Sequence, residues 1–596
     1  MPDYKTPLRD IRFVHDELLG YPAHYQSFPE FKEVTPDLVQ SILEQGAKFA
    51  EEVLAPLNRV GDREGCTWSE GGVVKTPTGF KEAYRQYVGS GWPGLAAPLA
   101  HGGQGLPESL ALTLLEMIGS ANWAWGMYPV LATGAKRTLD THGTDEQKKV
   151  YLPKLVSGQW TGTMCLTEPH CGSDVGLLRT KAEPQADGGY RITGTKIFIS
   201  SGEHDMAENI VHIVLARLPD APAGTKGISL FIVPKFVPDA KGEVGRRNGV
   251  SCGSIEHKMG IHGNSTCVMN YDNATGWLVG EENKGLNAMF VMMNEARLGV
   301  GVQGLAQSEV AYQNAVAYAK DRLQGRALTG PKAPDKAADP IIVHPDVRRT
   351  LMTIRAFNEA ARAMMVWMSL KGDVAHRSGG AKEREAADDM MGLLTPVLKG
   401  VLTDVGFANT VSAQQMYGGH GYIAEQGMEQ FVRDARIAMI YEGANGIQAL
   451  DLVGRKLPRD GGRAVTAYFA EVGAFVKDNA SNEAMKPVVG PLTTALGHLQ
   501  QATQWLIKNG AATPDNAGAA ATDYMYLFGL VTLGYMWGLM VKAAQTRLAT
   551  AASDHLKTKL VTGKFFAERM LPETALHLAR IQAGAATVME LPADAF

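Results

Sequence analysis

A single carboxylate, Glu442, lies in a sequence setting that suits a catalytic base. The surrounding segment, Arg433 to Gln448, reads R-D-A-R-I-A-M-I-Y-E-G-A-N-G-I-Q, so apolar residues precede the acid and Gly443 and Gly446 follow it. Burial disfavours the charged form of a carboxyl group and makes it a stronger base. Small residues beside it leave room for a substrate. The segment predicts either a base in a poorly solvated corner or an acid that caps the helix beginning there.

Three other segments combine hydrogen-bond donors with glycines. They read M-C-L-T-E-P-H-C-G-S-D from Met164, K-I-F-I-S-S-G from Lys196 and Q-M-Y-G-G-H-G-Y from Gln415. Neutral donors stabilise negative charge that develops on a bound group, and glycines let phosphates approach backbone N–H groups. Each segment alone also fits a structural role, as a polar turn that closes a barrel, a strand facing two layers, or an ordinary tight turn.

Taken together, these segments resemble the acyl-CoA dehydrogenase flavoproteins. The segment that contains Glu442 is similar to the family's base motif, I-Y-E-G-(T/A)-x-x-I-Q. The segments that start at Met164, Lys196 and Gln415 are similar to the family's blocks (Y/M)-x-(L/V)-T-E-P-x-x-G-S-D, K-x-(W/F)-I-(T/S)-x-G and Q-x-x-G-G-x-G, in that order. The blocks follow in the family's order over roughly residues 35–458. The resemblance implies FAD as cofactor and removal of hydrogen across the α,β bond of an acyl-CoA thioester, with Glu442 taking the α-proton.

The resemblance also assigns residues to the cofactor and the substrate. Those expected to bind flavin are Met164, Leu166, Thr167, Gly172, Ser173, Phe198, Ile199, Ser200, Arg322, Gln415, Gly418 and Gly419. Those expected to bind acyl-CoA are Ser173, Asn294, Arg297, Tyr441 and Gly443. Arg322 and the glycine turn would reach the flavin of a partner subunit in a homodimer, since the arginine fork fits phosphate oxygens. Phe198 and Ser200 replace the commoner Trp and Thr. Ala444 and Gly446 stand where many relatives carry Thr and Gln, so neither is assigned to flavin.

The elements that must position these residues form an α+β protein. Helical periodicity starts at Pro36, strand patterns fill Tyr190–Ile199 and Thr266–Tyr271, and a long helical pattern covers Met289–Lys320. The resemblance implies the acyl-CoA dehydrogenase fold, with an N-terminal helical domain, a middle β-barrel-like domain and a C-terminal helical bundle. The expected domains are an arm at 1–34, helices at 35–159, the β-domain at 160–282, the base-bearing bundle at 283–458, and an added helical domain at 459–596.

The composition of the chain indicates which kinds of partner and which cellular compartment to expect. The net charge is −4, and no long Lys/Arg run points to nucleic acid. Five scattered cysteines without a C-x-x-C pair indicate neither disulfides nor a zinc site. We therefore expect no bound metal, and we expect a cytoplasmic location. The N-terminus lacks the apolar core of a signal peptide. The uncharged stretch Tyr524–Val541 predicts a buried bundle helix in preference to a surface-membrane or spanning helix.

Several functions are compatible with the resemblance to acyl-CoA dehydrogenases. The extra N-terminal arm and long C-terminal domain resemble a subgroup with bacterial fatty acyl-CoA dehydrogenases for medium to long chains, which is the favoured interpretation, in β-oxidation. The same subgroup contains 3-methylthiopropionyl-CoA dehydrogenases of dimethylsulfoniopropionate breakdown, the principal alternative. An acyl-CoA oxidase and a non-catalytic flavin-bearing binding or stress protein also fit. For a dehydrogenase, the resemblance implies an electron-transfer flavoprotein as electron acceptor.

Overall fold

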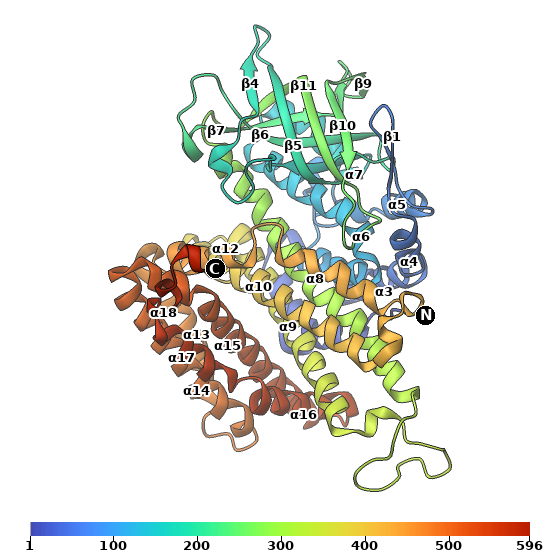
Figure 1. Cartoon of the computed structure of the whole chain (residues 1–596), viewed down its shortest axis with the longest axis vertical. Helices are drawn as coiled ribbons and strands as arrows, with labels where there is room; N and C mark the ends of the chain where they lie inside the picture. The colour runs from blue at the N-terminus through green and yellow to red at the C-terminus, as the bar shows by residue number, and fades with distance from the viewer. Residues whose placement is uncertain (1) are drawn as a thin grey trace. The chain divides into compact units, whose positions relative to one another are not determined.

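The computed structural model describes residues 2–596, which pack as two compact units. The sheet unit is Gln45–Gly299, and the helical unit consists of the residues up to Glu44 together with Val300–Phe596. All named strands lie in the sheet unit, and the helical unit contains helices only in its named elements (Figure 1). This separation makes the protein an α+β protein, as the sequence predicts.

A seven-stranded sheet forms the centre of the sheet unit. Its strands are β3 (Trp160–Cys165), β4 (Lys181–Pro184), β5 (Tyr190–Ser200), β6 (Asn209–Arg217), β7 (Ile228–Pro234), β10 (Val250–Ile255) and β11 (Thr266–Val279). Their order is β10-β11-β5-β4-β6-β3, while β7 pairs with both β11 and β6. These pairings close β11, β5, β4, β6 and β7 into a ring, which accounts for the predicted barrel-like domain.

Two hydrophobic cores hold the sheet unit together. One lies among the strands and includes Cys165, Ile192 and Ile199. The other packs the sheet against α6 (Glu108–His142) and α7 (Asp145–Ser157) and includes Trp160. Smaller elements complete the unit: α4 (Ala55–Glu64), β1 (Thr67–Ser69), β2 (Val73–Lys75), α5 (Phe80–Gly89), β8 (Phe236–Pro238) and β9 (Val244–Arg247). Helix α7 begins with a capping box, in which Thr144 and Gln147 each accept a backbone N–H.

The helical unit carries the long helices that follow the sheet. Helix α3 (Pro36–Phe49) begins at the predicted proline, and helix α8 (Gly285–Asp321) runs from residues of one unit into residues of the other. After an irregular segment come α9 (Pro345–Arg377), α10 (Ala381–Met416), α11 (Met428–Arg436) and α12 (Asn445–Asp451). Helices α9 and α10 pack side by side and are buried along most of their length.

The C-terminal extension is helical throughout its named elements. Its helices are α13 (Arg463–Asn479), α14 (Lys486–Trp505), α15 (Pro514–Leu548), α16 (Asp554–Arg569), α17 (Glu573–Ala583) and α18 (Ala586–Glu590). Helix α15 packs against α14, α16 and α17, which Figure 1 draws in orange to dark red. Helices α10 and α15 are apolar and long enough to cross a membrane, but 72% and 83% of their most apolar windows are buried inside the protein. The prediction of a buried helix at Tyr524–Val541 is therefore confirmed.

A network of buried charges joins the N-terminal arm to this extension. Asp10, on α1 (Leu8–Arg12), accepts hydrogen bonds from Arg362 on α9 and from Lys559 on α16. Lys559 also contacts Glu359 at 2.8 Å, and Arg362 contacts Glu309 at 3.2 Å. All five side chains are less than a tenth exposed. Paired charges of this kind fix the register of the segments that carry them, because an unpaired buried charge is costly.

Candidate active site

Glu442 lies in a short irregular loop, Tyr441–Ala444, between a 3-10 turn ending at Met439 and helix α12. Its backbone is left-handed, with φ of 59°, and Gly443 follows with φ of 87°. Such a conformation costs free energy in a non-glycine residue and is common at functional sites. Helix α12 begins at Asn445 with Ala444 as its N-cap, so Glu442 does not cap it. Glu442 is partly buried, which agrees only in part with the predicted poorly solvated corner.

Buried polar side chains hold the two carbonyl groups that this turn exposes. Lys399, on α10, donates from Nζ to the carbonyl of Gly443 at 2.8 Å. Gln448, on α12, donates from Nε2 to the carbonyls of Glu442 and Gly443, each at 3.2 Å. Lys399 and Gln448 are fully buried. The main chain at Glu442 is therefore fixed by side chains of both neighbouring helices, which limits the positions that the carboxylate can take.

Asn445 links Lys399 to a neighbouring carboxylate. Its Oδ1 accepts from Lys399 Nζ at 2.7 Å, while its Nδ2 donates to Thr403 Oγ1 at 2.9 Å and to Asp404 Oδ1 at 2.7 Å. Tyr441 is also held, because its hydroxyl donates to Gln303 Oε1. Both substrate residues predicted in this loop, Tyr441 and Gly443, are therefore next to Glu442 in a braced turn.

The first predicted flavin segment is fixed by Glu168. Its carboxylate accepts from the backbone N–H of Arg179 at 2.7 Å and of Thr180 at 3.0 Å, from Thr180 Oγ1 at 2.6 Å and from Lys196 Nζ at 2.9 Å. Lys196 opposes the effect of burial, and the pKa of Glu168 is lowered. Lys196 Nζ also donates to the carbonyl of Leu166, and Ile197 N–H to that of Thr167, both at 2.9 Å. These contacts bring the predicted flavin segments at Met164–Asp174 and Lys196–Gly202 together.

Phe198 presents an aromatic face to solvent from this junction. Its side chain is 59% exposed, and its backbone is left-handed with φ of 58°. A left-handed backbone is rare in a bulky residue, and such conformations cluster at functional sites. Ile199 behaves differently, since its side chain is 2% exposed within the strand core and only its main chain is available to a cofactor. Gly172, Ser173 and the hydroxyl-bearing Ser200 are exposed or partly exposed nearby.

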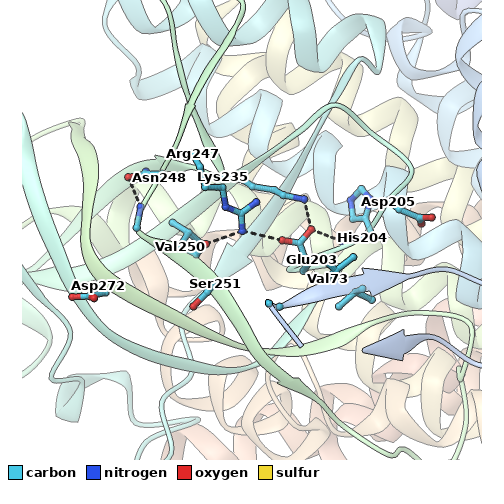
Figure 2. Close-up of a pocket in the computed structure, with 14 residues that line it drawn as sticks. Val73, Glu203, His204, Asp205, Lys235, Arg247, Asn248, Val250, Ser251 and Asp272 are labelled. Atoms are coloured by element: carbon cyan, nitrogen blue, oxygen red, sulfur yellow. Dashed lines mark hydrogen bonds and ion pairs between the residues drawn. The ribbon is translucent and has the colours of Figure 1, made fainter. Parts of the chain in front are cut away.

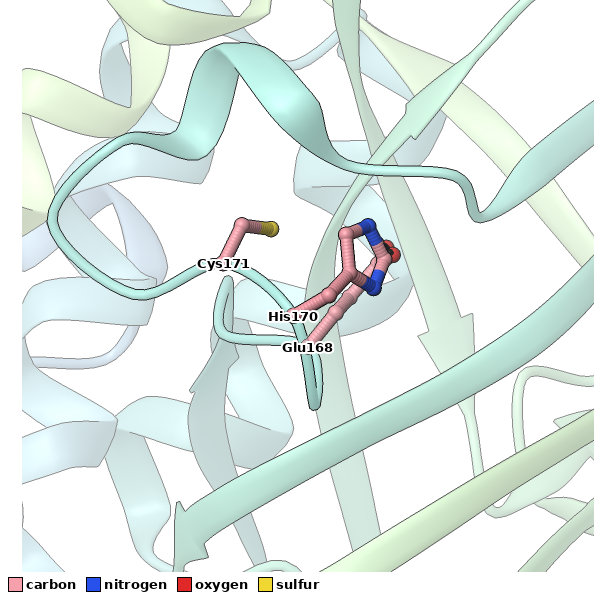
Figure 3. Close-up of side chains that lie close together, drawn as sticks. All are labelled: Glu168, His170 and Cys171. Atoms are coloured by element: carbon pink, nitrogen blue, oxygen red, sulfur yellow. Dashed lines mark ion pairs between the residues drawn. The ribbon is translucent and has the colours of Figure 1, made fainter.

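Glu168, His170 and Cys171 bring potential metal-ligand atoms within 4.8 Å of one another (Figure 3). His170 Nε2 lies 3.7 Å from Glu168 Oε2 and 2.9 Å from the carbonyl of Leu177. The oxygens of Glu168 are already used by four donors, one of them the ammonium of Lys196. A cation at this position would compete with that ammonium. We therefore interpret the cluster as part of the hydrogen-bond network around Glu168 that fixes the predicted flavin segment Met164–Asp174.

The glycine turn after α10 is braced by stacked aromatic rings. Tyr417 stacks on Tyr318 of α8 with ring centroids 4.0 Å apart, and the Tyr318 hydroxyl lies 2.9 Å from His420 Nδ1. Gly418 is left-handed, with φ of 56°. The predicted residues Gln415, Gly418, Gly419 and Arg322 are all exposed. Arg322 follows Tyr318 by one helical turn, so the predicted phosphate-binding residues occupy neighbouring segments of the helical unit.

The two predicted substrate residues on α8 differ in burial. Asn294 is exposed, whereas Arg297 is 4% exposed and is therefore not a solvated helix residue. Between them, Glu295 pairs with Arg137 of α6 at 2.8 Å. Met292 packs against Gly134 of α6 so closely that a Cβ on the glycine would lie 2.7 Å from Met292 Cγ. Helix α8 is thus pressed against α6 on the stretch that carries these residues.

The sheet unit also has a polar pocket of about 450 Å³ that contains none of the predicted residues. Figure 2 shows Glu203 between Lys235 and Arg247, with which it forms ion pairs. Asp205 accepts from the hydroxyl and backbone N–H of Thr76. Glu203 and Asp205 in the lining of this pocket are thus paired within the sheet unit, and the lining includes residues of the β1–β2 hairpin and of the sheet.

Four family models cover the chain in sequence. They are the acyl-CoA dehydrogenase N-terminal domain at residues 37–159, the middle domain at 163–274, the C-terminal domain at 283–457, and the acetyl-CoA dehydrogenase C-terminal-like model at 468–592. A 3-methylmercaptopropionyl-CoA dehydrogenase of Ruegeria pomeroyi is 43% identical over 97% of this chain and 98% of its own length. The chain belongs to the acyl-CoA dehydrogenase family. Members of this family are oxidoreductases that act on the CH–CH bond of acyl-CoA thioesters.

Further acyl-CoA dehydrogenases share the full length. A broad-specificity linear acyl-CoA dehydrogenase of Mycobacterium tuberculosis is 35% identical over the whole of both chains. Among solved structures, Caenorhabditis elegans ACDH-11 in complex with C11-CoA superimposes with a TM-score of 0.79 over 99% of this chain and 96% of its own, at 18% identity. An acyl-CoA dehydrogenase from Bacillus anthracis complexed with FAD superimposes with a TM-score of 0.73 over 92% of this chain and 89% of its own, at 21% identity. These likenesses confirm the acyl-CoA dehydrogenase fold with its added C-terminal helices.

Of the two side chains that hold the carbonyls of Glu442 and Gly443, the acyl-CoA dehydrogenase motifs include Gln448 but not Lys399. Lys399 was detectable as a single charge within the apolar run Leu393–Val401. Gln448 is the last residue of the base motif, and Asp404 has no feature in the sequence that distinguishes it from a surface carboxylate. Only the packing of α10 against α12 shows that these side chains converge on one loop.

Proposed function

We propose that the protein oxidises 3-methylthiopropionyl-CoA, or a thioester of similarly short acyl length, with Glu442 as the catalytic base. The observation that carries this proposal is the 43% identity to the Ruegeria enzyme over nearly the whole of both chains. The 3-methylmercaptopropionyl-CoA in that enzyme's name is another name for 3-methylthiopropionyl-CoA. The identity to the Ruegeria enzyme exceeds the 35% identity to the linear acyl-CoA dehydrogenase of Mycobacterium tuberculosis. The 3-methylthiopropionyl-CoA interpretation of the sequence is thus better supported than the fatty acyl one.

Two contacts in the sheet unit hold the helix that carries the predicted substrate residues. By family resemblance, Asn294 and Arg297 lie along the acyl-CoA path. The helix that carries them is held to α6 by the Arg137–Glu295 ion pair and by the close contact of Gly134 with Met292.

FAD is the cofactor of the family, and the residues present fit it. Phe198 is exposed in a strained conformation suited to covering a flat ring, and the Gly418–Gly419 turn is open, with no atom within 4 Å of a Cβ added at either position. When bound, FAD would supply the hydride acceptor for the β-hydrogen, and the part of this chain's own Glu442 is to accept the α-proton. Arg322 and the exposed glycine turn would serve the flavin of a second copy of the chain. We further propose an electron-transfer flavoprotein as the electron acceptor.

The residues around Glu442 have a defined task in this reaction. An α-proton of a thioester is far less acidic than a carboxylic acid, so the base needs help from hydrogen bonds to the thioester oxygen. By resemblance, the main-chain N–H of Glu442 supplies one of them. Lys399 and Gln448 hold the carbonyls of Glu442 and Gly443, which follow that N–H along the chain, and so limit the directions that the main chain at Glu442 can take.

The proposal is tested by anaerobic reduction of the purified flavoprotein with 3-methylthiopropionyl-, butanoyl-, octanoyl- and palmitoyl-CoA. We expect the first to bleach the flavin fastest, and faster bleaching by palmitoyl-CoA would restore the fatty acyl interpretation. Glu442→Gln should retain FAD and bind acyl-CoA while flavin reduction slows by roughly 100- to 10,000-fold. The exposed Glu590→Gln is the matched control and should react normally. Peroxide formation in air at the rate of turnover would instead identify an acyl-CoA oxidase.

A further inference from the structure

One side chain of the C-terminal extension is linked to the Glu442 loop by hydrogen bonds. Tyr526, on α15, donates from its hydroxyl to Asp404 Oδ2 at 2.6 Å. The other oxygen of Asp404 accepts from Asn445 Nδ2 at 2.7 Å. Asn445 Oδ1 accepts in turn from Lys399 Nζ, which donates to the carbonyl of Gly443. A continuous chain of hydrogen bonds therefore runs from the extension to the residue next to Glu442.

The helices that carry this chain are in close contact. A Cβ added to Gly529 of α15 would lie 2.6 Å from Val401 Cγ2 of α10, and one added to Gly400 would collide with Met525. Glycines at these positions let α10 and α15 approach closely enough for the phenol of Tyr526 to reach Asp404. The contact is made by the same part of α10 that presents Lys399 and Thr403.

The aromatic ring of Tyr526 is held in place by a stacking contact with helix α17. Its ring stacks on His577 of α17 with an interplanar angle of 12°, and His577 Nδ1 lies 2.7 Å from Asp523 Oδ1. Burial and the hydrogen bond to Asp404 raise the pKa of Tyr526, so its hydroxyl remains protonated and acts as a donor. The donor to Asp404 therefore has one orientation and one charge state.

The charges along the chain are complementary. Lys399 is fully buried, and its Nζ donates to Gly443 O and to Asn445 Oδ1. Asp404 supplies a negative charge one amide group away, and the Asn445 amide is polarised between the two. Hydrogen bonds that involve charged groups are stronger than neutral ones, and a connected network strengthens its members.

We infer that Tyr526 and Asp404 are positioning residues for catalysis, through which the C-terminal extension holds the Glu442 loop in its reactive conformation. The inference rests on the proposed role of Glu442 as base. It gives the extension, which lies outside the four sequence motifs described above, a part in positioning the catalytic base. The left-handed turn at Glu442 and Gly443 makes such support necessary, because a strained turn relaxes when the groups that hold it are removed.

The test compares variants of the full-length flavoprotein with saturating 3-methylthiopropionyl- or butanoyl-CoA. Tyr526→Phe keeps the ring stack and removes one hydroxyl, so flavin reduction should slow by about 3- to 10-fold, the loss expected for one hydrogen bond. Asp404→Asn should slow it by about 10- to 100-fold, as misplacement of a catalytic group does. FAD content, acyl-CoA dissociation constant and melting temperature should change little for Tyr526→Phe.

The matched control is Tyr535→Phe, which removes a hydroxyl from the same helix. That hydroxyl donates to Glu471 at 3.4 Å, away from the hydrogen-bond chain, and its loss should leave reduction unchanged. A rescue provides the sharper test. Asn445→Asp alone places two carboxylates side by side and should slow reduction, whereas Asp404→Asn combined with Asn445→Asp exchanges the amide and the carboxylate and should recover most of the rate.

The outcomes separate the two proposals. An inactive Glu442→Gln with Tyr526→Phe at the wild-type reduction rate would overturn the positioning role and leave the base assignment intact. A Glu442→Gln variant with normal reduction would overturn the base and the positioning role together. If Asp404→Asn yields no soluble protein, Tyr526→Phe and the double exchange still decide the question.

Discussion

Removing the charge of Asp10 should destabilise the helical unit strongly. Asp10→Asn keeps the shape of the side chain but leaves Lys559 and Arg362 without their shared carboxylate. Both cations are nearly or fully buried, and breaking a buried pair costs about 3–5 kcal/mol. For a unit of this size, the melting temperature should fall on the order of 5 °C. Differential scanning fluorimetry measures this shift, with circular dichroism to follow the helices.

A matched control and a pH series sharpen this prediction. Glu568→Gln breaks an exposed pair with Lys564 on the same helix as Lys559 and should cost about 0–1 kcal/mol. Burial alone would raise the pKa of Asp10, but Lys559 and Arg362 hold it well below its ordinary value of 3.8. The stabilisation is therefore present above that pH and is lost as the pH falls, so the two proteins should converge only in acid. An Asp10→Asn variant that melts within about 1 °C of the parent at neutral pH would refute a stabilising network.

Two further predictions concern stability. The hydrogen bond to Asp62 outweighs burial and raises the pKa of His262 to about 9, so His262→Gln should destabilise the sheet unit below pH 6.5 and lose its effect as the pH rises through 9. A pH-independent difference in melting temperature would contradict this. Gly529→Ala should cost about 1–3 kcal/mol because its Cβ meets Val401, whereas Gly518→Ala, with open space on the same helix, should be neutral or stabilising by up to about 1 kcal/mol. Urea unfolding distinguishes the two glycines.

The elements of the fold were predictable where a local rule decides them. Helix α3 begins at Pro36, the capping box forms at Thr144, and β5 spans the predicted alternating stretch because each depends on residues a few positions apart. The left-handed backbone at Glu442 is a different case. Nothing in the residue type predicts it, because non-glycine residues avoid this region unless contacts elsewhere impose it.

The supporting residues of the site were not predictable for a related reason. Lys399, Asp404 and Tyr526 meet the Glu442 loop only through the packing of α10, α12 and α15, which are far apart in sequence. The burial of Arg297 likewise depends on tertiary packing, which the spacing of residues along one helix does not reveal. Motifs identify groups that contact ligands, whereas the residues that hold those groups vary with the way in which neighbouring helices pack.

The helical unit is assembled from two separated stretches of chain, one before and one after the sheet unit. During synthesis, Asp10 leaves the ribosome long before Lys559, and at about 5–20 residues per second the delay is roughly 30–100 s. The sheet unit, being continuous, can complete its folding within that interval. The apolar surface of the early helices must remain without its native partner meanwhile, so this interval is the stage of biogenesis at which chaperones and proteases have the greatest opportunity to act.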